Sequence, residues 1–464
     1  MTGNTAIKTI DANQQVFVDL AQKMWDNPET AFNEVKACAW TAEVLKQFGF
    51  EVTTGAFNLP TCVIGKWGSG KPVIGLLGEL DALPGLSQKL STEKEAVVEG
   101  APGHGCGHNL LNVACLAGAV GLKAEMEEKN LPGTIIFYGC PAEEVITGKV
   151  FMAREGAFDG LDAAIAWHGS SVNKASDGEM NGMNSAIFHF KGRTAHAGGD
   201  PHNGRSALDA AELMSVGANY LREHVTSDIR IHYVYKEAGT APNIVPDKAA
   251  VWYYVRGLSR DTIEDTYNRL IKVAEGAAHM TETEMEIEFL GGCYNTKPNH
   301  TLSNLAVECL QQIGVPTYTE EELAFADALN KKSPKFAEAT ATGLLKNGPI
   351  FNTVPDWKWT DIKSGGSTDV GDVTFICPTT MISTATYNAA APGHSWQITS
   401  CAGMGIGYKG MIFGAKGCAL TALKLIEDPA KLQACKDEFM QVTGGRPYKC
   451  PIPKEVPIPQ PANK

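Results

Sequence analysis

Apolar runs and amphipathic stretches alternate along the first part of this 464-residue chain. Three nearly continuous apolar runs are expected to be strands covered on both faces: residues 71–83, 133–140 and 163–169. Apolar side chains at helical spacing predict helices before and between these strands, at residues 12–25, 34–50 and 113–129. Strands and helices in this order predict an open, mixed and largely parallel α/β sheet.

The pattern changes near residue 184, where alternating strands and amphipathic helices follow in the order β-α-β-β-α-β. These elements are expected at residues 185–193, 206–225, 230–238, 249–258, 262–279 and 284–292. Because this order is the ferredoxin-like pattern, we expect an inserted α+β domain of residues 184–301. The catalytic domain would then be discontinuous, formed by residues 1–183 and 302–464.

The α/β pattern resumes after the insert and is less regular than before it. Residues 302–314 and 410–428 carry helical patterns, whereas residues 317–362 are polar and predict irregular structure. The tail of residues 450–464 is rich in proline and is expected to be extended.

Composition and charge exclude several classes of partner. A formal net charge of −12 repels both nucleic acid and anionic membranes. The N-terminus lacks a secretory signal, and no window approaches the roughly 18 apolar residues of a transmembrane helix. The 12 cysteines show no paired spacing, so we expect reduced, mostly buried thiols and a cytoplasmic protein.

Residues 103–111, GHGCGHNLL, place soft ligand side chains on a glycine-rich backbone. Cys106 and His108 are separated by one residue, so in an extended segment they would project to the same side. Thiolate and imidazole both suit zinc and similar transition metals. Two alternatives remain at this point: a glycine-rich turn without function, and a thiol enzyme that uses Cys106 as nucleophile with His108.

Acidic and imidazole side chains also follow the predicted strands. Pro141 must end the strand before Glu143 and Glu144, so both carboxylates can converge at the carboxyl edge of the sheet, where open α/β folds bind ligands. Two neighbouring glutamates can divide their roles, one as a metal ligand and the other as a general base. Further candidates end other segments: Glu79, Asp81, His168 and His394.

Weaker candidates lie outside the strand ends. The predicted insert carries His196 before a helix and Asn243 in a turn. The segment GGSTDVGDV supplies Ser367, Thr368 and Asp369 on a glycine-rich loop whose amides could hold an anion. Each of these signals is weak alone, because loops are normally rich in such residues.

Taken together, the chain resembles the aminoacylase/carboxypeptidase metallopeptidase family, in its branch of hippurate and indole-acetyl-amino-acid hydrolases. The resemblance extends over essentially the whole chain. It is carried by the stretches NPET, GKPVIGLLGELDALPGLSQ, GHGCGHNLL, FYGCPAEE, GRSALDA, AEGAAHMTET, EELAFA, STDVGDV, HSWQ and CPIPK.

The resemblance implies an amidohydrolase that cleaves N-acyl amino acids, N-aroyl glutamates above all, with two divalent metal ions, zinc or manganese. The implied metal ligands are Cys106, His108, Glu144, His168 and His394. The implied catalytic residues are Glu143 as general base, Asp81, and His196. The implied substrate-binding residues are His196, Asn243, Arg256 and Ser367.

The family also implies that the insert is a lid and dimerisation domain. His196 would then reach the site of a partner, in a homodimer or in a heterodimer with a paralogous subunit. A non-catalytic or regulatory subunit of a two-protein hydrolase is the remaining alternative. Two positions depart from the family pattern: Glu79 stands where more distant relatives have a histidine ligand, and Asn109 replaces an acid.

Overall fold

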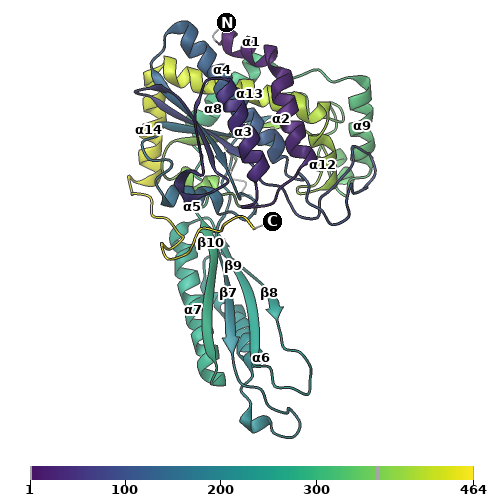
Figure 1. The fold of residues 1–464 in the computed structure, drawn as a ribbon, viewed down its shortest axis with the longest axis vertical. Coiled ribbons are helices and arrows are strands. Elements are labelled where there is room, and N and C mark those ends of the chain that lie inside the picture. Colours follow the sequence, from purple (N-terminus) through teal and green to yellow (C-terminus); the bar gives the residue numbers. More distant parts are fainter. Residues whose placement is uncertain (1–2, 361–364, 463–464) are drawn as a thin grey trace.

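The computed structural model describes residues 3–360 and 365–462, which form a large α/β part and a smaller part that projects from it (Figure 1). Within these residues the large part contains a seven-stranded sheet. Its strand order is β1 (Glu51–Thr54), β2 (Val63–Ser69), β4 (Gly133–Cys140), β3 (Val73–Glu79), β5 (Ala163–Ser170), β11 (Thr379–Ala385) and β6 (Lys174–Ala175). The central strands β4, β3, β5 and β11 are parallel, which confirms the predicted mixed, largely parallel sheet.

Helices cover both faces of this sheet, which explains the continuous apolar runs of its central strands. One face packs against helices that include α2 (Gln14–Asp26), α3 (Val35–Gln47), α4 (His108–Lys129), α8 (His300–Ile313) and α13 (Gly405–Glu427). The other face is covered by α5 (Gly148–Arg154) and α11 (Val370–Val373). The sequence pattern missed α1 (Asn4–Ala12), α12 (Trp396–Ala402) and α14 (Pro429–Thr443).

The smaller part has the predicted β-α-β-β-α-β order. It consists of β7 (Gly182–Lys191), α6 (Ala207–Leu221), β8 (Arg230–Glu237), β9 (Lys248–Gly257), α7 (Arg260–Thr281) and β10 (Glu284–Cys293). The strands pair antiparallel in the order β10-β7-β9-β8. Both helices pack on one face of this sheet. The expected insert limits, residues 184 and 301, fall inside β7 and α8.

The expectation of irregular structure for residues 317–362 is wrong for its first half. Helices α9 (Glu320–Lys331) and α10 (Phe336–Ala341) form there. Thr319 and Glu322 make reciprocal hydrogen bonds that cap the first turn of α9. Residues 361–362 lie outside the described part of the chain.

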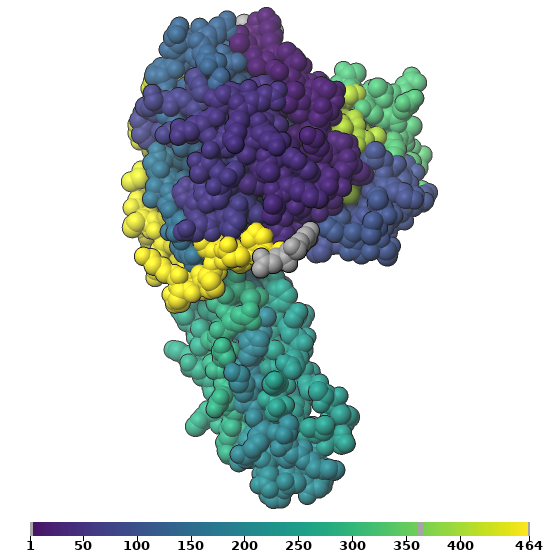
Figure 2. All heavy atoms as spheres, viewed as in Figure 1, coloured from purple at the N-terminus to yellow at the C-terminus, as the bar shows by residue number. Residues whose placement is uncertain are grey.

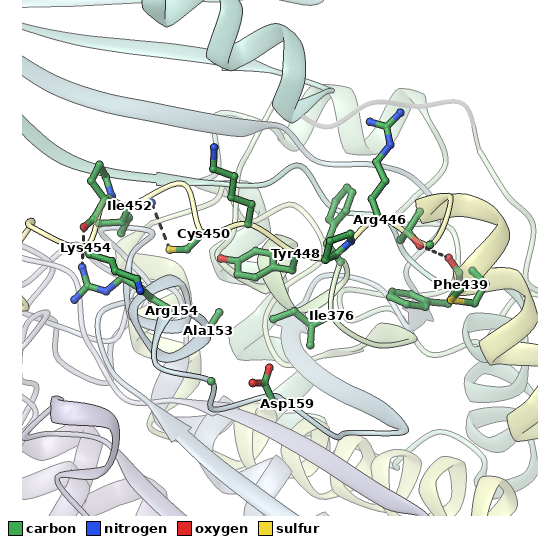
Figure 3. A pocket seen from close by; sticks show the side chains of 18 residues that line it. Ala153, Arg154, Asp159, Ile376, Phe439, Arg446, Tyr448, Cys450, Ile452 and Lys454 are labelled. Atoms are coloured by element: carbon green, nitrogen blue, oxygen red, sulfur yellow. Dashed lines mark hydrogen bonds between the residues drawn. The ribbon is translucent and has the colours of Figure 1, made fainter.

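The C-terminal segment contacts both parts of the molecule (Figure 2). Arg446 pairs with Asp261 of α7 at 3.2 Å, and the Tyr448 hydroxyl donates to the Asp372 carboxylate at 2.7 Å. Residues 450–462 contain no helix or strand, as expected for the tail, and residues 463–464 lie outside the described range. The segment borders a surface cavity of about 690 Å³, which none of the predicted metal ligands lines (Figure 3).

Membrane and thiol expectations can be compared with the described residues. None of the helices in residues 3–360 and 365–462 has the length and apolar character needed to cross a bilayer. All 12 cysteines are free thiols, and only Cys106 and Cys450 are not fully buried.

Candidate metal centre

Most of the predicted metal ligands lie at the carboxyl edge of the parallel strands. His168 lies near the end of β5, and Glu144 follows β4, which ends at Cys140; Glu79, the last residue of β3, lies at the same edge. The turn after β4 places Ala142 in the left-handed region at a φ of 57°, which bends the chain sharply before the two glutamates. Helix α4 begins at the same edge with His108.

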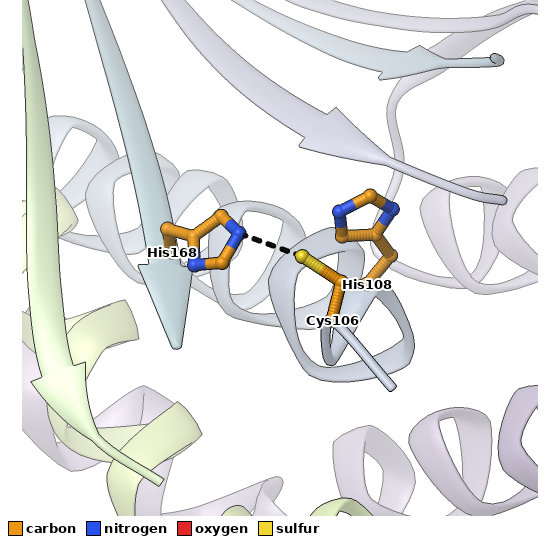
Figure 4. A group of neighbouring side chains, drawn as sticks. All are labelled: Cys106, His108 and His168. Carbon is orange, nitrogen blue, oxygen red and sulfur yellow. Dashed lines mark hydrogen bonds between the residues drawn. The ribbon is translucent and has the colours of Figure 1, made fainter. Parts of the chain in front are cut away.

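The segment that carries Cys106 and His108 is not extended, so that premise of the sequence interpretation is wrong. Gly107 has a φ of 86°, a conformation that glycine adopts without strain, and α4 starts at the next residue. The turn nevertheless brings both side chains toward β5. The Cys106 Sγ lies 3.2 Å from His168 Nε2, and the rings of His108 and His168 are 6.0 Å apart (Figure 4).

His394 completes a second group of ligand atoms around the same thiol. Its Nε2 lies 3.6 Å from Glu144 Oε2, and its side chain is the most exposed of the five, at 60%. Ligand atoms of Cys106, His108 and His168 lie within 4.8 Å of one another, and so do those of Cys106, Glu144 and His394. The five predicted ligands therefore form two overlapping groups that share Cys106.

Unpartnered donor atoms show that these residues fit divalent cations. His108 Nε2 and Glu144 Oε1 are buried and have no hydrogen-bond partner among the described residues. A buried polar atom without a partner costs about 1–3 kcal/mol, which a bound cation would offset. Thiolate, imidazole and carboxylate together are a donor set that suits zinc and related transition metals.

Asp81 orients the ligand group through contacts with His108 and with the turn that carries Glu143 and Glu144. Its carboxylate accepts hydrogen bonds from the amides of Glu143 and Glu144, at 3.1 and 2.9 Å. It also lies 3.3 Å from His108 Nδ1, which is 3.0 Å from the Asp81 carbonyl. Burial opposes the charged form of Asp81, but these hydrogen bonds hold its pKa below its ordinary value. Asp81 therefore fixes the His108 ring and the glutamate turn.

Two of the three histidines have pKa shifts that suit a metal site, whereas Cys106, Glu144 and Asp81 raise the pKa of His108 against the effect of its burial. Burial, together with the carboxylates of Glu79 and Asp369, raises the pKa of Glu143 well above its ordinary value. Burial and the neighbouring His108 lower the pKa of both His168 and His394, which favours the neutral imidazoles that bind metals. Burial also raises the pKa of the Cys106 thiol to about 12. That direction opposes the alternative of a free thiolate nucleophile, which needs a lowered pKa.

A buried ion triad supports the same edge, and its cation, Lys149, is the member that sequence analysis missed. The Lys149 ammonium donates to Glu79 at 2.6 Å and to Asp369 at 2.7 Å, and all three side chains are at most 2% exposed. The other Glu79 oxygen lies 3.2 Å from His108 Nε2, and Glu79, His108 and Glu143 form a third group of close ligand atoms. Lys149 sits in an amphipathic stretch, VITGKVFMAR, with no local motif around it.

The two insert candidates lie together but apart from this group. His196 forms an antiparallel bridge with Ile244, and the Ala197 amide donates to the Asn243 carbonyl at 3.0 Å. Both residues are exposed, and they follow the ends of β7 and β8 that point away from the large part. A ten-residue strand such as β7 separates these ends from the junction of the insert with the large part by roughly 33 Å. Among the described residues, His196 belongs to none of the groups of close ligand atoms.

Arg256 and Ser367 lie at the junction of the two parts. An Arg256 guanidinium nitrogen donates to the Gly365 carbonyl at 3.3 Å. The Ser367 hydroxyl is buried and has no hydrogen-bond partner within the described residues. Gly365 and Ser367 lie on a loop that continues to Asp369 of the ion triad. This loop therefore connects the insert to the metal-ligand edge of the large sheet.

The chain is similar to known proteins over nearly its whole length. Residues 179–281 match the family model of the peptidase dimerisation domain. The chain is 41% identical over 465 residues to one of the two subunits of the p-aminobenzoyl-glutamate hydrolase of Escherichia coli, with 96% of each chain covered. It is 28% identical over 451 residues to the mouse Xaa-Arg dipeptidase, which covers 94% of this chain and 91% of the relative.

A solved structure shows the same fold. The dinuclear metal-binding M20 peptidase of Bacillus subtilis matches with a TM-score of 0.56 and 18% identity, over 90% of this chain and 99% of that one. The whole-length relative, the dimerisation domain and the shared fold confirm the family resemblance found in the sequence. The chain belongs to the M20 family of metal-dependent peptidases and amidohydrolases.

Proposed function

We propose that this protein hydrolyses the amide bond of N-acyl amino acids, and that its preferred substrates are N-aroyl glutamates such as p-aminobenzoyl-glutamate. The observation that carries the proposal is the convergence of the five predicted ligands next to Glu143, two of them with buried donor atoms that have no hydrogen-bond partner among the described residues. The name of the 41% identical Escherichia coli relative supports the substrate class.

Cys106, His108, Glu144, His168 and His394 would hold two divalent cations, zinc or manganese. Five protein ligands exceed the three of an ordinary single-ion catalytic site, which supports a pair. When bound, such ions lower the pKa of a water molecule and polarise the scissile carbonyl. Asp81 would keep His108 in the required tautomer and orientation, since it contacts the ring at Nδ1 and leaves Nε2 for coordination.

Glu143 would act as the general base and then as the general acid. Its Oε2 lies 3.8 Å from His108 Nε2, so a water between the ligands is within its reach. Its raised pKa increases the affinity of the carboxylate for the proton of that water, and bound cations nearby would keep the carboxylate ionised beforehand. The same proton would then pass to the nitrogen of the departing amino acid.

The remaining roles would belong to the insert and the junction loop. Arg256 would bind the substrate carboxylate, with Ser367 of the adjacent loop as a hydrogen-bonding partner. Asn243 would bind the substrate near its carbonyl or carboxylate. His196 would donate to the oxyanion of the tetrahedral intermediate, a contribution on the order of 3 kcal/mol.

His196 and Asn243 would reach the site of a partner subunit. The insert offers a surface for that partner: β8 is an edge strand of its described sheet, and α6 exposes an apolar stripe. The exposed apolar side chains on these two elements are Leu213, Val216, Tyr220, Val234 and Tyr235. A second copy or a paralogous subunit would cover them, and the dimerisation-domain match supports either assembly. The free thiols support a cytoplasmic location, where cysteines stay reduced.

The direct test is turnover of a panel of N-acyl amino acids by the purified chain loaded with zinc or manganese. Glu143→Ala should abolish turnover while bound metal, measured by elemental analysis, stays near the wild-type amount. Turnover above a few per cent of wild type would reject Glu143 as the base.

The same preparation separates the alternatives. Loss of activity with a chelator and recovery with added metal would support the metal mechanism, whereas inactivation by alkylation alone would support a thiol enzyme. A pure chain that is folded, metal-loaded and inactive until a paralogous subunit is added would support the regulatory-subunit alternative.

A further inference from the structure

The insert sheet has an open face, on the side opposite α6 and α7, and its junction end is cationic. Arg230 and His232 are two residues apart on β8, and Tyr254 and Arg256 are two residues apart on β9. Residues two apart in a strand share a face, so all four side chains project to the open face. They line a cavity of about 670 Å³ together with Asn181, Ser227, Asp228, Leu258 and Gly365. The cavity therefore lies directly beside the loop that leads to the ion triad.

Two arginines stand directly opposite each other in this cavity. Arg230 is the cross-strand partner of Arg256, and like charges in such a position destabilise a sheet. One guanidinium nitrogen of Arg230, Nη1, donates to the carbonyls of Ser227 and Ile229. Arg256 Nε is buried and has no hydrogen-bond partner among the described residues. Both guanidiniums thus retain donors for an anion.

Besides the two arginines, the described lining of the cavity holds one acid and one histidine. Asp228 is the one acid among the described lining residues, and one of its oxygens accepts from the Leu258 amide at 3.0 Å. His232 faces the same side, and its pKa is lowered by burial and by the guanidiniums of Arg256, Arg222 and Arg230. With His232 neutral, the lining carries an excess of positive charge.

We propose that Arg230, with His232, binds the side-chain carboxylate of a dicarboxylic amino acid whose α-carboxylate pairs with Arg256. Three carbon atoms join the two carboxylates of glutamate, a separation similar to the roughly 5 Å between the Cβ atoms of cross-strand neighbours, from which both arginine side chains start. Arg230 is then the residue that selects N-acyl glutamates over N-acyl derivatives of neutral amino acids. This inference rests on the proposed hydrolase function and specifies its substrate class.

The kinetic test compares the full-length, metal-loaded wild type with Arg230→Gln on N-benzoyl-glutamate, N-benzoyl-glutamine and N-benzoyl-alanine. A charge-assisted hydrogen bond predicts a kcat/KM for the glutamate conjugate about 10- to 100-fold lower in the variant, mainly through KM. The other two conjugates should change less than about threefold. Arg269→Gln is the matched control, because it removes the same charge from α7, where Arg269 contacts Asp265 and the His224 carbonyl.

An equal loss on all three conjugates would overturn the proposal, since Arg230 would then act on folding or on a shared step. A calorimetric titration with glutarate and butyrate supplies a readout independent of turnover. The wild type should bind glutarate at least about tenfold more tightly than butyrate, and Arg230→Gln should remove that difference.

Equal binding of the two acids by the wild type would overturn the carboxylate site whatever the enzyme hydrolyses. Selective, Arg230-dependent glutarate binding by a protein that hydrolyses none of the conjugates would retain the site and reject the proposed function instead.

Discussion

The carboxyl edge of the large sheet and the tip of the insert are opposite kinds of site. At the sheet edge, His108, Glu79 and Asp369 are almost completely buried and held by several contacts from different elements. At the tip, His196 and Asn243 are exposed, and the His196 ring accepts from the amides of Gly198 and Gly199, within its own loop.

The difference teaches which functional groups one chain can position alone. Buried carboxylates and imidazoles need hydrogen-bond or ion-pair partners, and these partners fix the positions of the side chains. An exposed histidine gains little from its own chain and needs another surface to become part of a site. One chain therefore positions the ligand group at the sheet edge by itself, whereas the side chains at the tip of the insert need the surface of a partner.

Among the variants that test this comparison, the largest effect is expected from His196→Ala, which should lower kcat about 100- to 1,000-fold without unfolding the protein. Mixing it with Glu143→Ala should restore about a quarter of wild-type activity, because half of the dimers are mixed and each has one intact site. The measurement is turnover after subunit exchange. His202→Ala, in the same exposed loop, is the control and should remain active. A mixture as inactive as its components would reject donation across the dimer.

Lys149→Met tests the buried side of the comparison. It leaves the carboxylates of Glu79 and Asp369 together without their cation, so the free energy of unfolding should fall by about 3 kcal/mol. Urea unfolding of the metal-free protein measures the change. Lys191→Met is the control, because its ion pair with Glu286 is more than half exposed and contributes less than about 1 kcal/mol. Equal changes in the two variants would show that the triad contributes no more than a surface pair.

Tyr220→Ala tests the surface that would join two inserts. Tyr220 is 75% exposed on α6, and the loss of a large interface aromatic should weaken dimerisation by about 1–2 kcal/mol, or about 5- to 30-fold in Kd. Sedimentation over a dilution series measures this constant. Met440→Ala, an exposed apolar change on α14, should leave it unchanged. An unaltered Kd for Tyr220→Ala would place the dimer contact elsewhere.

The smallest effect is expected from Thr319→Ala at the start of α9. The variant removes the hydroxyl that accepts from the Glu322 amide, so stability should fall by about 1 kcal/mol with kcat unchanged. Thermal or urea unfolding measures the loss, and Thr317→Ala, two residues before the cap, is the matched control. A loss below a few tenths of a kcal/mol would mean that packing alone specifies α9.

The sequence predicted the sheet and the insert well because their signals are local. Continuous apolar runs mark β3, β4 and β5, and alternation marks the insert strands. Helix α9 was missed although the capping pair Thr319 and Glu322 stands at its start. Its apolar spacing is weak, and the polar surroundings concealed that signal.

The sequence could predict the residue types of the candidate site but not their arrangement in space. Cys106 and His108 stand out by composition, but the turn at Gly107 that aims them depends on a φ that no pattern specifies. Lys149 and Asp369 are far apart in sequence and meet only because α5 and the loop before α11 pack on the same sheet face. Such long-range ion pairs leave no periodic trace along the chain.

The order of the ligands along the chain has a consequence for biosynthesis. Cys106, His108, Glu144 and His168 all precede the insert, whereas β11, which pairs with β5, and His394 follow it. A nascent chain that has left the ribosome only as far as the insert therefore holds four donors without the flanking strand or the last imidazole. The second group of ligand atoms, Cys106, Glu144 and His394, is therefore complete only after the projecting domain has been translated.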